Sequence, residues 1–119
     1  MRRLWKRLAG SIQSWFSRHF RRYTLKSLEE MPEENHIRRR VAYWVGVEGY
    51  KWCLVFICPC GCREVIYLNL LPTARPLWRV ELYKGKSFSV APSVNRTNGC
   101  RANFFLREGR VVFCRGRNS

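Results

Sequence analysis

The sequence contains no aspartate, and its only two histidines, His19 and His36, both lie near the N-terminus. A Ser-His-Asp triad in its standard form is therefore excluded, and so is a metal site rich in His and Asp. Any catalysis would rely on Glu, Cys, Ser, Arg, Lys or Tyr, or on a histidine supplied by the N-terminal arm.

Long hydrophobic runs are also missing. The longest, Trp52 to Cys58, is far too short to span a bilayer. Residues 1–22 alternate apolar and basic side chains, whereas a secretory signal needs an unbroken apolar core. We therefore expect a cytoplasmic protein. In that reducing compartment, metal binding is a better hypothesis for the six cysteines than disulfide bonding.

Acidic residues of any kind are few. The chain has 23 Lys and Arg against eight Glu, which gives a net charge of +15 at pH 7 over 119 residues. A chain this basic is attracted to polyanions such as nucleic acid, anionic lipid or an acidic protein, and the charge alone does not choose among them. The simplest alternative is a solvated surface on a single small domain.

Residues 1–23 form a basic amphipathic segment. Their apolar side chains, from Leu4 to Tyr23, recur at spacings that place them on one face of a helix. Three alternatives remain open for that face. It packs on the domain's own sheet, it fills a groove on a partner protein, or the helix binds an anionic surface of lipid or nucleic acid.

The rest of the chain divides into a polar connector, 24–40, and a β-rich domain, 41–119. Pro32 is incompatible with a helix interior, so the connector is predicted to be a turn or short loop. Beyond it, short β-type runs alternate with turns such as Glu48-Gly49. The expected strands are 41–47, 50–58, 65–71, 77–83, 87–90, 103–106 and 110–114. This pattern predicts a mostly β fold, a small antiparallel sheet or barrel preceded by one N-terminal amphipathic helix.

The run Cys58-Pro59-Cys60-Gly61-Cys62 is the strongest chemical signal in the sequence. Its three thiols are too close together to pair comfortably as disulfides. Pro and Gly suit a tight zinc knuckle, in which backbone amides donate hydrogen bonds to metal-bound sulfur, and thiolate ligands favour zinc.

Cys100 and Cys114 supply the further ligands for a closed, structural zinc site, and spacing alone does not decide which four of the five cysteines bind. The alternative is five buried cysteines with no metal. Cys53 lies in mid-strand and is interpreted as a buried apolar thiol.

A second constellation spans residues 91–105, which are rich in Arg and small polar residues and are predicted to be a loop between two strands. Binding and catalytic groups tend to lie in such segments. Arg96 and Arg101 are suited to hold a carboxylate or phosphate by bidentate pairing. The alternative is an ordered loop capped by Asn and Thr hydrogen bonds.

Several of these motifs recur, in this order, in a known family. They are the Cys-Pro-Cys-Gly-Cys run, Leu71-Pro72, Trp78-Arg79-Val80, Pro92-Ser93, Gly99-Cys100-Arg101, Phe104, and the last hairpin from Gly109-Arg110 to Cys114. Over about residues 41–114 the chain resembles a family of small bacterial proteins long labelled as of unknown function. Its members are encoded beside a ubiquitin-like protein and enzymes of activating and conjugating type. The resemblance implies a zinc-stabilised serine-type peptidase that matures this ubiquitin-like protein or removes it from targets.

The chain departs from the family pattern at one place. The family commonly has Gly-Cys-Arg-Ser-His-Phe, and here Ala102 and Asn103 stand at the Ser and His positions. If those positions are the catalytic pair, the chain is an inactive derivative that binds the ubiquitin-like protein. Ser93 is the remaining candidate nucleophile, with His36 as the imidazole to activate it. Arg96 and Arg101 would grip the partner, with Ser93 and Asn103 lining the cleft.

Two functions of other classes compete with this hypothesis. A nucleic-acid-binding zinc module would use the positive charge together with Trp and Tyr side chains for phosphate contacts and stacking. A membrane-surface adaptor would use residues 1–23 as its anchor.

Overall fold

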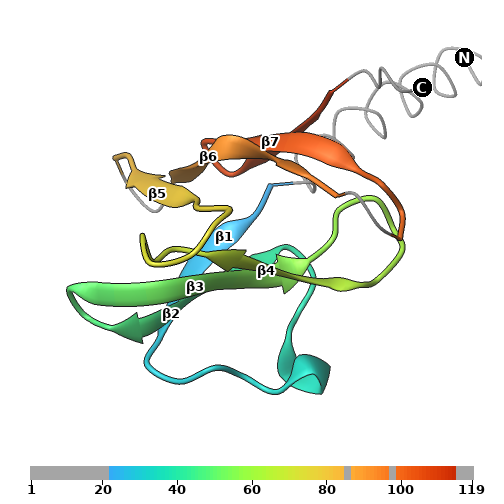
Figure 1. The fold of residues 1–119 in the computed structure, drawn as a ribbon. Helices are drawn as coiled ribbons and strands as arrows, with labels where there is room; N and C mark the ends of the chain where they lie inside the picture. The colour runs from blue at the N-terminus through green and yellow to red at the C-terminus, as the bar shows by residue number, and fades with distance from the viewer. Residues whose placement is uncertain (1–21, 85–86, 97–98, 115–119) are drawn as a thin grey trace, which may run out of the picture.

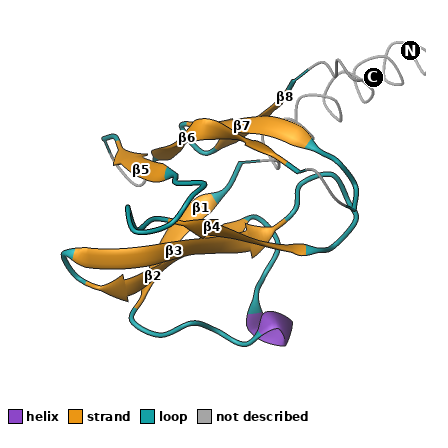
Figure 2. Cartoon of the chain, in the orientation of Figure 1, coloured by secondary structure: helices purple, strands orange, loops and turns teal. Residues whose placement is uncertain are grey.

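The computed structural model describes residues 22–84, 87–96 and 99–114, which form two four-stranded sheets (Figures 1 and 2). The first sheet has the strand order β1-β2-β3-β4, and the second has β5-β6-β7-β8. The strands are β1 (Thr24–Leu28), β2 (Val41–Val47), β3 (Tyr50–Ile57), β4 (Val65–Asn69), β5 (Arg79–Leu82), β6 (Phe88–Asn95), β7 (Asn103–Arg107) and β8 (Arg110–Phe113). A single 3₁₀ turn, η1 (Glu34–His36), is the only helical element in these residues.

Most neighbouring strands are antiparallel and are joined by tight turns, as the sequence predicts. β1 is the exception, because it pairs in parallel with β2, with Thr24 opposite Val41 and Leu28 opposite Val45. A parallel pair needs a crossover connection, and residues 29–40 provide it. Within the described part of the chain, no helix is long and apolar enough to cross a membrane.

The main core lies between the two sheets. Alternate residues of β3, Leu54 and Phe56, face Phe88 of β6 and Phe104 of β7, and all four are 0 % exposed. The rings of Phe56 and Phe104 meet edge to face, with centroids 6.2 Å apart. Tyr23 enters the same core and donates a 2.5 Å hydrogen bond to the carbonyl of Ile57. The core therefore ends beside Cys58, where β3 stops.

The first sheet is buried on its other face as well. The outward residues Tyr43, Val45, Cys53 and Val55 form a second cluster with Ile37 of the crossover segment. Figure 1 shows this segment and η1 running below the first sheet, on the side away from β6 and β7. Burial on both faces explains why β3 is an almost continuous apolar run rather than an alternating one.

The structure confirms the mostly β architecture and corrects three details. The chain forms two sheets, where a single sheet or barrel was expected. Thr24–Leu28, predicted as connector, forms β1, because its backbone pairs with β2 and its polar side chains remain exposed at a sheet edge. Residues 91–95, predicted as loop, continue β6 past a register irregularity between Val90 and Val94 that accommodates Pro92. The predicted helix of residues 1–23 lies almost wholly outside the described residues.

Candidate metal centre

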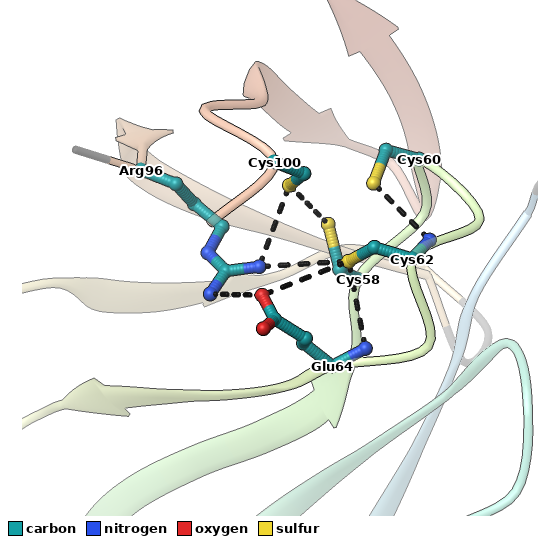
Figure 3. A network of polar contacts seen from close by, with 6 residues as sticks. All are labelled: Cys58, Cys60, Cys62, Glu64, Arg96 and Cys100. Atoms are coloured by element: carbon teal, nitrogen blue, oxygen red, sulfur yellow. Dashed lines mark hydrogen bonds and ion pairs between the residues drawn. The ribbon is translucent and has the colours of Figure 1, made fainter. Parts of the chain in front are cut away.

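Four thiols from two distant parts of the chain meet at one end of the sandwich. The sulfur atoms of Cys58, Cys60, Cys62 and Cys100 all lie within 4.8 Å of one another, and we call these residues the thiol cluster (Figure 3). Cys58 follows β3, and Cys100 precedes β7. The Sγ atoms of Cys58 and Cys100 are 3.6 Å apart. The cluster therefore links the two sheets where their strands end.

The Cys58–Cys62 run folds into the predicted knuckle. Gly61 has φ +102°, a conformation that side-chain-bearing residues rarely adopt. The turned backbone directs amides at sulfur: Cys62 N–H donates to Cys60 Sγ at 3.3 Å, and Glu64 N–H donates to Cys62 Sγ at 3.5 Å. A 2.8 Å hydrogen bond from Cys58 N–H to the Glu64 carbonyl closes the loop.

The cluster fits a tetrahedral metal ion. Zinc–sulfur bonds of about 2.3 Å place the sulfurs of a tetrahedron about 3.8 Å apart. The 3.6 Å separation of Cys58 and Cys100 is close to this value, and the other pairs lie within 4.8 Å. Four thiolates are a soft donor set, so the cluster is suited to hold a metal ion of the zinc type.

Arg96 and Glu64 form an ion pair beside the cluster. The guanidinium of Arg96 lies 2.8 Å from Glu64 Oε1 and donates to Cys100 Sγ at 3.4 Å and Cys62 Sγ at 3.7 Å. Its side chain is only 19 % exposed. Figure 3 shows the guanidinium pointing into the cluster. The sequence analysis predicts that Arg96 binds a partner, and it does not identify Glu64 as part of the site. The position of Glu64, two residues after the last cysteine of the knuckle, could have indicated its role.

The thiols of the cluster differ in pKa because their surroundings differ. Burial raises the pKa of Cys58 to about 12, and burial also raises the pKa of Cys60. Burial opposes ionisation of Cys100 too, but the backbone N–H of Ala102 and the neighbouring thiols lower its pKa to about 7. Despite the cost of burial, the sulfur and carboxylate partners of Arg96 raise its pKa, so the guanidinium stays charged. In the metal-free cluster Cys100 therefore ionises more readily than Cys58 or Cys60.

The two remaining cysteines lie elsewhere. Cys114, a candidate ligand from the sequence, is not among the four clustered thiols; it follows β8, where its N–H donates to the carbonyl of Asn103 at 2.8 Å. Cys53 is 5 % exposed in the outer core of the first sheet, as its sequence context predicts, and burial raises its pKa to about 11.

Ala102 and Asn103 directly follow the thiol cluster. The carbonyl of Ala102 accepts a 2.8 Å hydrogen bond from Arg96 N–H, and Asn103 opens β7 opposite Asn95 of β6. The Oδ1 atom of Asn103 is buried and has no hydrogen-bond partner among the described residues. A buried acceptor without a donor is costly and uncommon, so this position is under-satisfied.

The structure separates Ser93 from His36. Ser93 lies on β6 in the second sheet, and its carbonyl accepts a 3.2 Å hydrogen bond from the Trp78 indole. His36 lies in η1, an exposed turn next to Ile37 on the outer face of the first sheet. The first sheet stands between them, so the structure does not bring His36 and Ser93 together.

Arg101 differs from Arg96. It is exposed, and its backbone is left-handed at φ 56°. It therefore remains available to solvent next to Ala102.

A family model described as "Bacterial ubiquitination-like system serine protease (BubE)" matches residues 27–114. The chain belongs to the BubE family. Searches of curated proteins and of solved structures find no match. Membership confirms the resemblance drawn from the sequence and places the chain in a family of bacterial ubiquitination-like systems. The matched segment contains the thiol cluster, Ala102 and Asn103.

Proposed function

We propose that this BubE-family chain is a zinc-stabilised, peptidase-derived binder of the ubiquitin-like protein of a bacterial ubiquitination-like system. The observation that carries the proposal is the pair Ala102–Asn103 at the two positions where the resembling family commonly has Ser and His, which we take to be its nucleophile and base. Alanine has no nucleophilic atom, and an amide does not accept a proton near neutral pH.

The surroundings of Ser93 favour binding over hydrolysis. A serine hydroxyl needs a base within hydrogen-bond reach before it attacks a carbonyl. His36 is the one histidine in the described residues, and it lies across the first sheet. In this proposal the cleft around Ser93 and Asn103 binds the ubiquitin-like protein but does not cleave it.

Zinc in the thiol cluster would be structural. Four sulfur ligands leave no coordination position open for water or substrate. When bound, zinc would crosslink the end of β3 to the segment before β7. In a small domain, such binding contributes directly to folding. The cluster therefore holds Ala102 and Asn103 in place and takes no part in chemistry.

We propose that Arg101 contacts the ubiquitin-like protein. Its exposed guanidinium stands next to Ala102 and is suited to pair with a carboxylate of the ubiquitin-like protein. Arg96, the other sequence candidate, is engaged with Glu64 and the thiol cluster and acts there instead. The conjugation enzymes of the system are further proposed partners, and the cytoplasm is the proposed location.

The test uses the full chain and a C-terminally extended ubiquitin-like protein from the same system. We expect the two to bind in calorimetry, and the extended protein to stay intact in mass spectrometry after prolonged incubation. Arg101→Glu should weaken binding, while Arg107→Glu, a matched reversal on the exposed end of β7, should not. Absence of binding would refute the proposal. Cleavage abolished by Ser93→Ala would instead establish an enzyme.

A further inference from the structure

A groove of about 750 Å³ lies between the two sheets, at the end of β3 opposite the thiol cluster. β3 begins at Tyr50 beside this groove and ends at Ile57, directly before Cys58. The lining residues come from β1, the β2–β3 hairpin and β5, and they include Ser27, Glu29, Trp44, Glu48, Lys51 and Leu82. Figure 1 shows β5 above this end of β2 and β3. We call this feature the end groove.

The walls of the end groove are largely apolar. Trp44 is half-buried against the main core, and Leu82 is 60 % exposed. Lys51 is held against the wall, because its ammonium lies 5.6 Å from the centroid of the Trp44 ring and donates to the carbonyl of Gly46 at 2.6 Å. An exposed leucine beside a half-buried indole is apolar surface that an occupant could bury.

Two exposed carboxylates, Glu29 and Glu48, also line the end groove. The three ion pairs among the described residues involve other glutamates, which are Glu33, Glu64 and Glu81. The groove therefore sets two carboxylates against the single ammonium of Lys51. In a chain of net charge +15 this is a local site of negative charge, and it favours an occupant that is both cationic and apolar.

The chain itself contains a segment of this character, outside the described residues. Residues 1–21 contain five Arg, one Lys and no acidic residue. Their large apolar side chains recur at spacings that place them on one face of a helix, and they are Leu4, Trp5, Leu8, Ile12, Trp15, Phe16 and Phe20. The segment therefore matches the end groove in both charge and polarity.

The segment is also long enough to reach the end groove. It joins the described chain beside Tyr23, and β1, an edge strand, leads from there to Ser27 and Glu29. The path from Tyr23 to Ser27 is about 13 Å at the rise of a strand, whereas a helix over 1–21 would be about 30 Å long. A helix that runs back along β1 brings residues 6–12 to the groove.

A second exposed apolar face suits the segment less well. On β7 and β8, Phe105 pairs with Val112, which is 42 % exposed. Arg107 lies 4.3 Å from the centroid of the Phe105 ring, and Arg110 is exposed opposite Arg107. These guanidinium groups would repel a basic segment. Charge therefore favours the end groove over this face.

We propose that residues 1–21 dock into the end groove of the same chain. Their apolar face packs on Trp44 and Leu82, and their basic side chains pair with Glu29 and Glu48. Because the groove lies at the opposite end of β3 from the thiol cluster, this contact leaves the surface around Arg101 open. It is independent of the binder proposal and stands if that proposal fails.

The test is hydrogen exchange followed by mass spectrometry on the full zinc-loaded chain. We expect the amides of residues 4–16 to exchange at least about tenfold faster after Glu29→Lys/Glu48→Lys, because two attractions become repulsions. Glu33→Lys/Glu108→Lys makes the same change of charge at exposed sites outside the groove and should leave exchange within about twofold. Circular dichroism and metal content confirm that each variant is folded.

Two further comparisons separate the apolar contact from the charges. Leu82→Ser should also speed the exchange of residues 4–16, whereas Val112→Ser, on the second apolar face, should not. Lys6→Glu/Arg7→Glu leaves the folded domain unaltered and should release the segment. Combined with Glu29→Lys/Glu48→Lys, it should restore slow exchange, because the charges are exchanged across the same contact.

Five results would overturn the proposal. Residues 4–16 exchange rapidly in the unaltered chain, or the control pair Glu33→Lys/Glu108→Lys releases them equally. The exchanged charges fail to restore protection in a folded chain. Protection appears only at concentrations where sedimentation shows dimers, so the groove holds a second copy. Protection appears only with vesicles of anionic phospholipid, so the segment binds a membrane instead.

Discussion

Arg96 joins Glu64 to the thiol cluster, with its guanidinium 2.8 Å from Glu64 Oε1 and 3.4 Å from Cys100 Sγ. Glu64 follows the knuckle, Arg96 follows β6, and Cys100 lies in the segment before β7. A cation at this position offsets the negative charge of four thiolates around a divalent ion, and groups that contact ligands in this way tune metal affinity. The ion pair therefore belongs to the metal site, although neither residue is a ligand.

Replacing Arg96 should weaken metal binding without abolishing it. We expect Arg96→Gln to lower zinc affinity by about 10- to 100-fold, because the thiolates lose a charged donor and Glu64 loses its partner. Competition with a chromophoric chelator measures the change. Arg101→Gln removes the same charge from a side chain outside the cluster, and an equal loss there would contradict the assignment.

Four cysteines should bind zinc and two should not. Elemental analysis should give one metal ion per chain, and Ser at any of the four clustered positions should lower the metal content and the thermal stability. Cys114→Ser should retain the metal, because Cys114 is not part of the cluster. Chelation of the unaltered chain should strongly reduce its folding free energy, because structural zinc contributes about 10–16 kcal/mol in zinc-finger peptides. Full metal content in Cys58→Ser would refute this ligand set.

Metal affinity should fall steeply in acid. In the metal-free chain burial holds the pKa of Cys58 at about 12, so this thiol is protonated at neutral pH and must release its proton to bind. Cys58 alone then contributes about a tenfold rise in affinity for each pH unit between about pH 6 and 8. Chelator competition across that range measures the slope, and calorimetry in buffers of different ionisation enthalpy counts the protons. A flat profile would contradict metal binding by a thiol that is protonated in the metal-free chain.

The sequence predicts the strands and the knuckle well, since both follow from local patterns. The β2–β3 hairpin follows from its Glu48-Gly49 turn, and the knuckle follows from three thiols in five residues. What the sequence does not reveal is long-range pairing. β1 forms only because β2 lies beside it, and Arg96 meets Glu64 only because the ends of β3 and β6 converge. The fourth cysteine of the cluster is not predictable from the sequence for the same reason. Only the packing of β7 brings Cys100, and not Cys114, to the knuckle.

The register irregularity in β2 between Val45 and Gly46 should depend on Gly46. A Cβ at this position would lie 2.3 Å from the carbonyl oxygen of Tyr50, and φ is +134°. Gly46→Ala should therefore destabilise the fold by about 3 kcal/mol, from backbone strain together with the clash. Gly49→Ala is the matched control: its φ is +83° but nothing lies within 4 Å of the added Cβ, so we expect about 1 kcal/mol. Equal losses in urea unfolding would show that the close contact with Tyr50 does not matter.

Introducing the family residues Ser and His at positions 102 and 103 should restore hydrolysis. Ala102→Ser/Asn103→His places a hydroxyl and an imidazole at the two consecutive positions where β7 begins, and the buried Asn103 Oδ1 there has no hydrogen-bond partner among the described residues. We expect the double variant to hydrolyse the extended ubiquitin-like protein, and each single variant to remain inactive because a nucleophile and a base act as a unit. Mass spectrometry of the product identifies the cleaved bond, and calorimetry confirms that the substrate still binds. A double variant that binds zinc and the partner but leaves the substrate intact would show that the catalytic groups of this fold lie elsewhere.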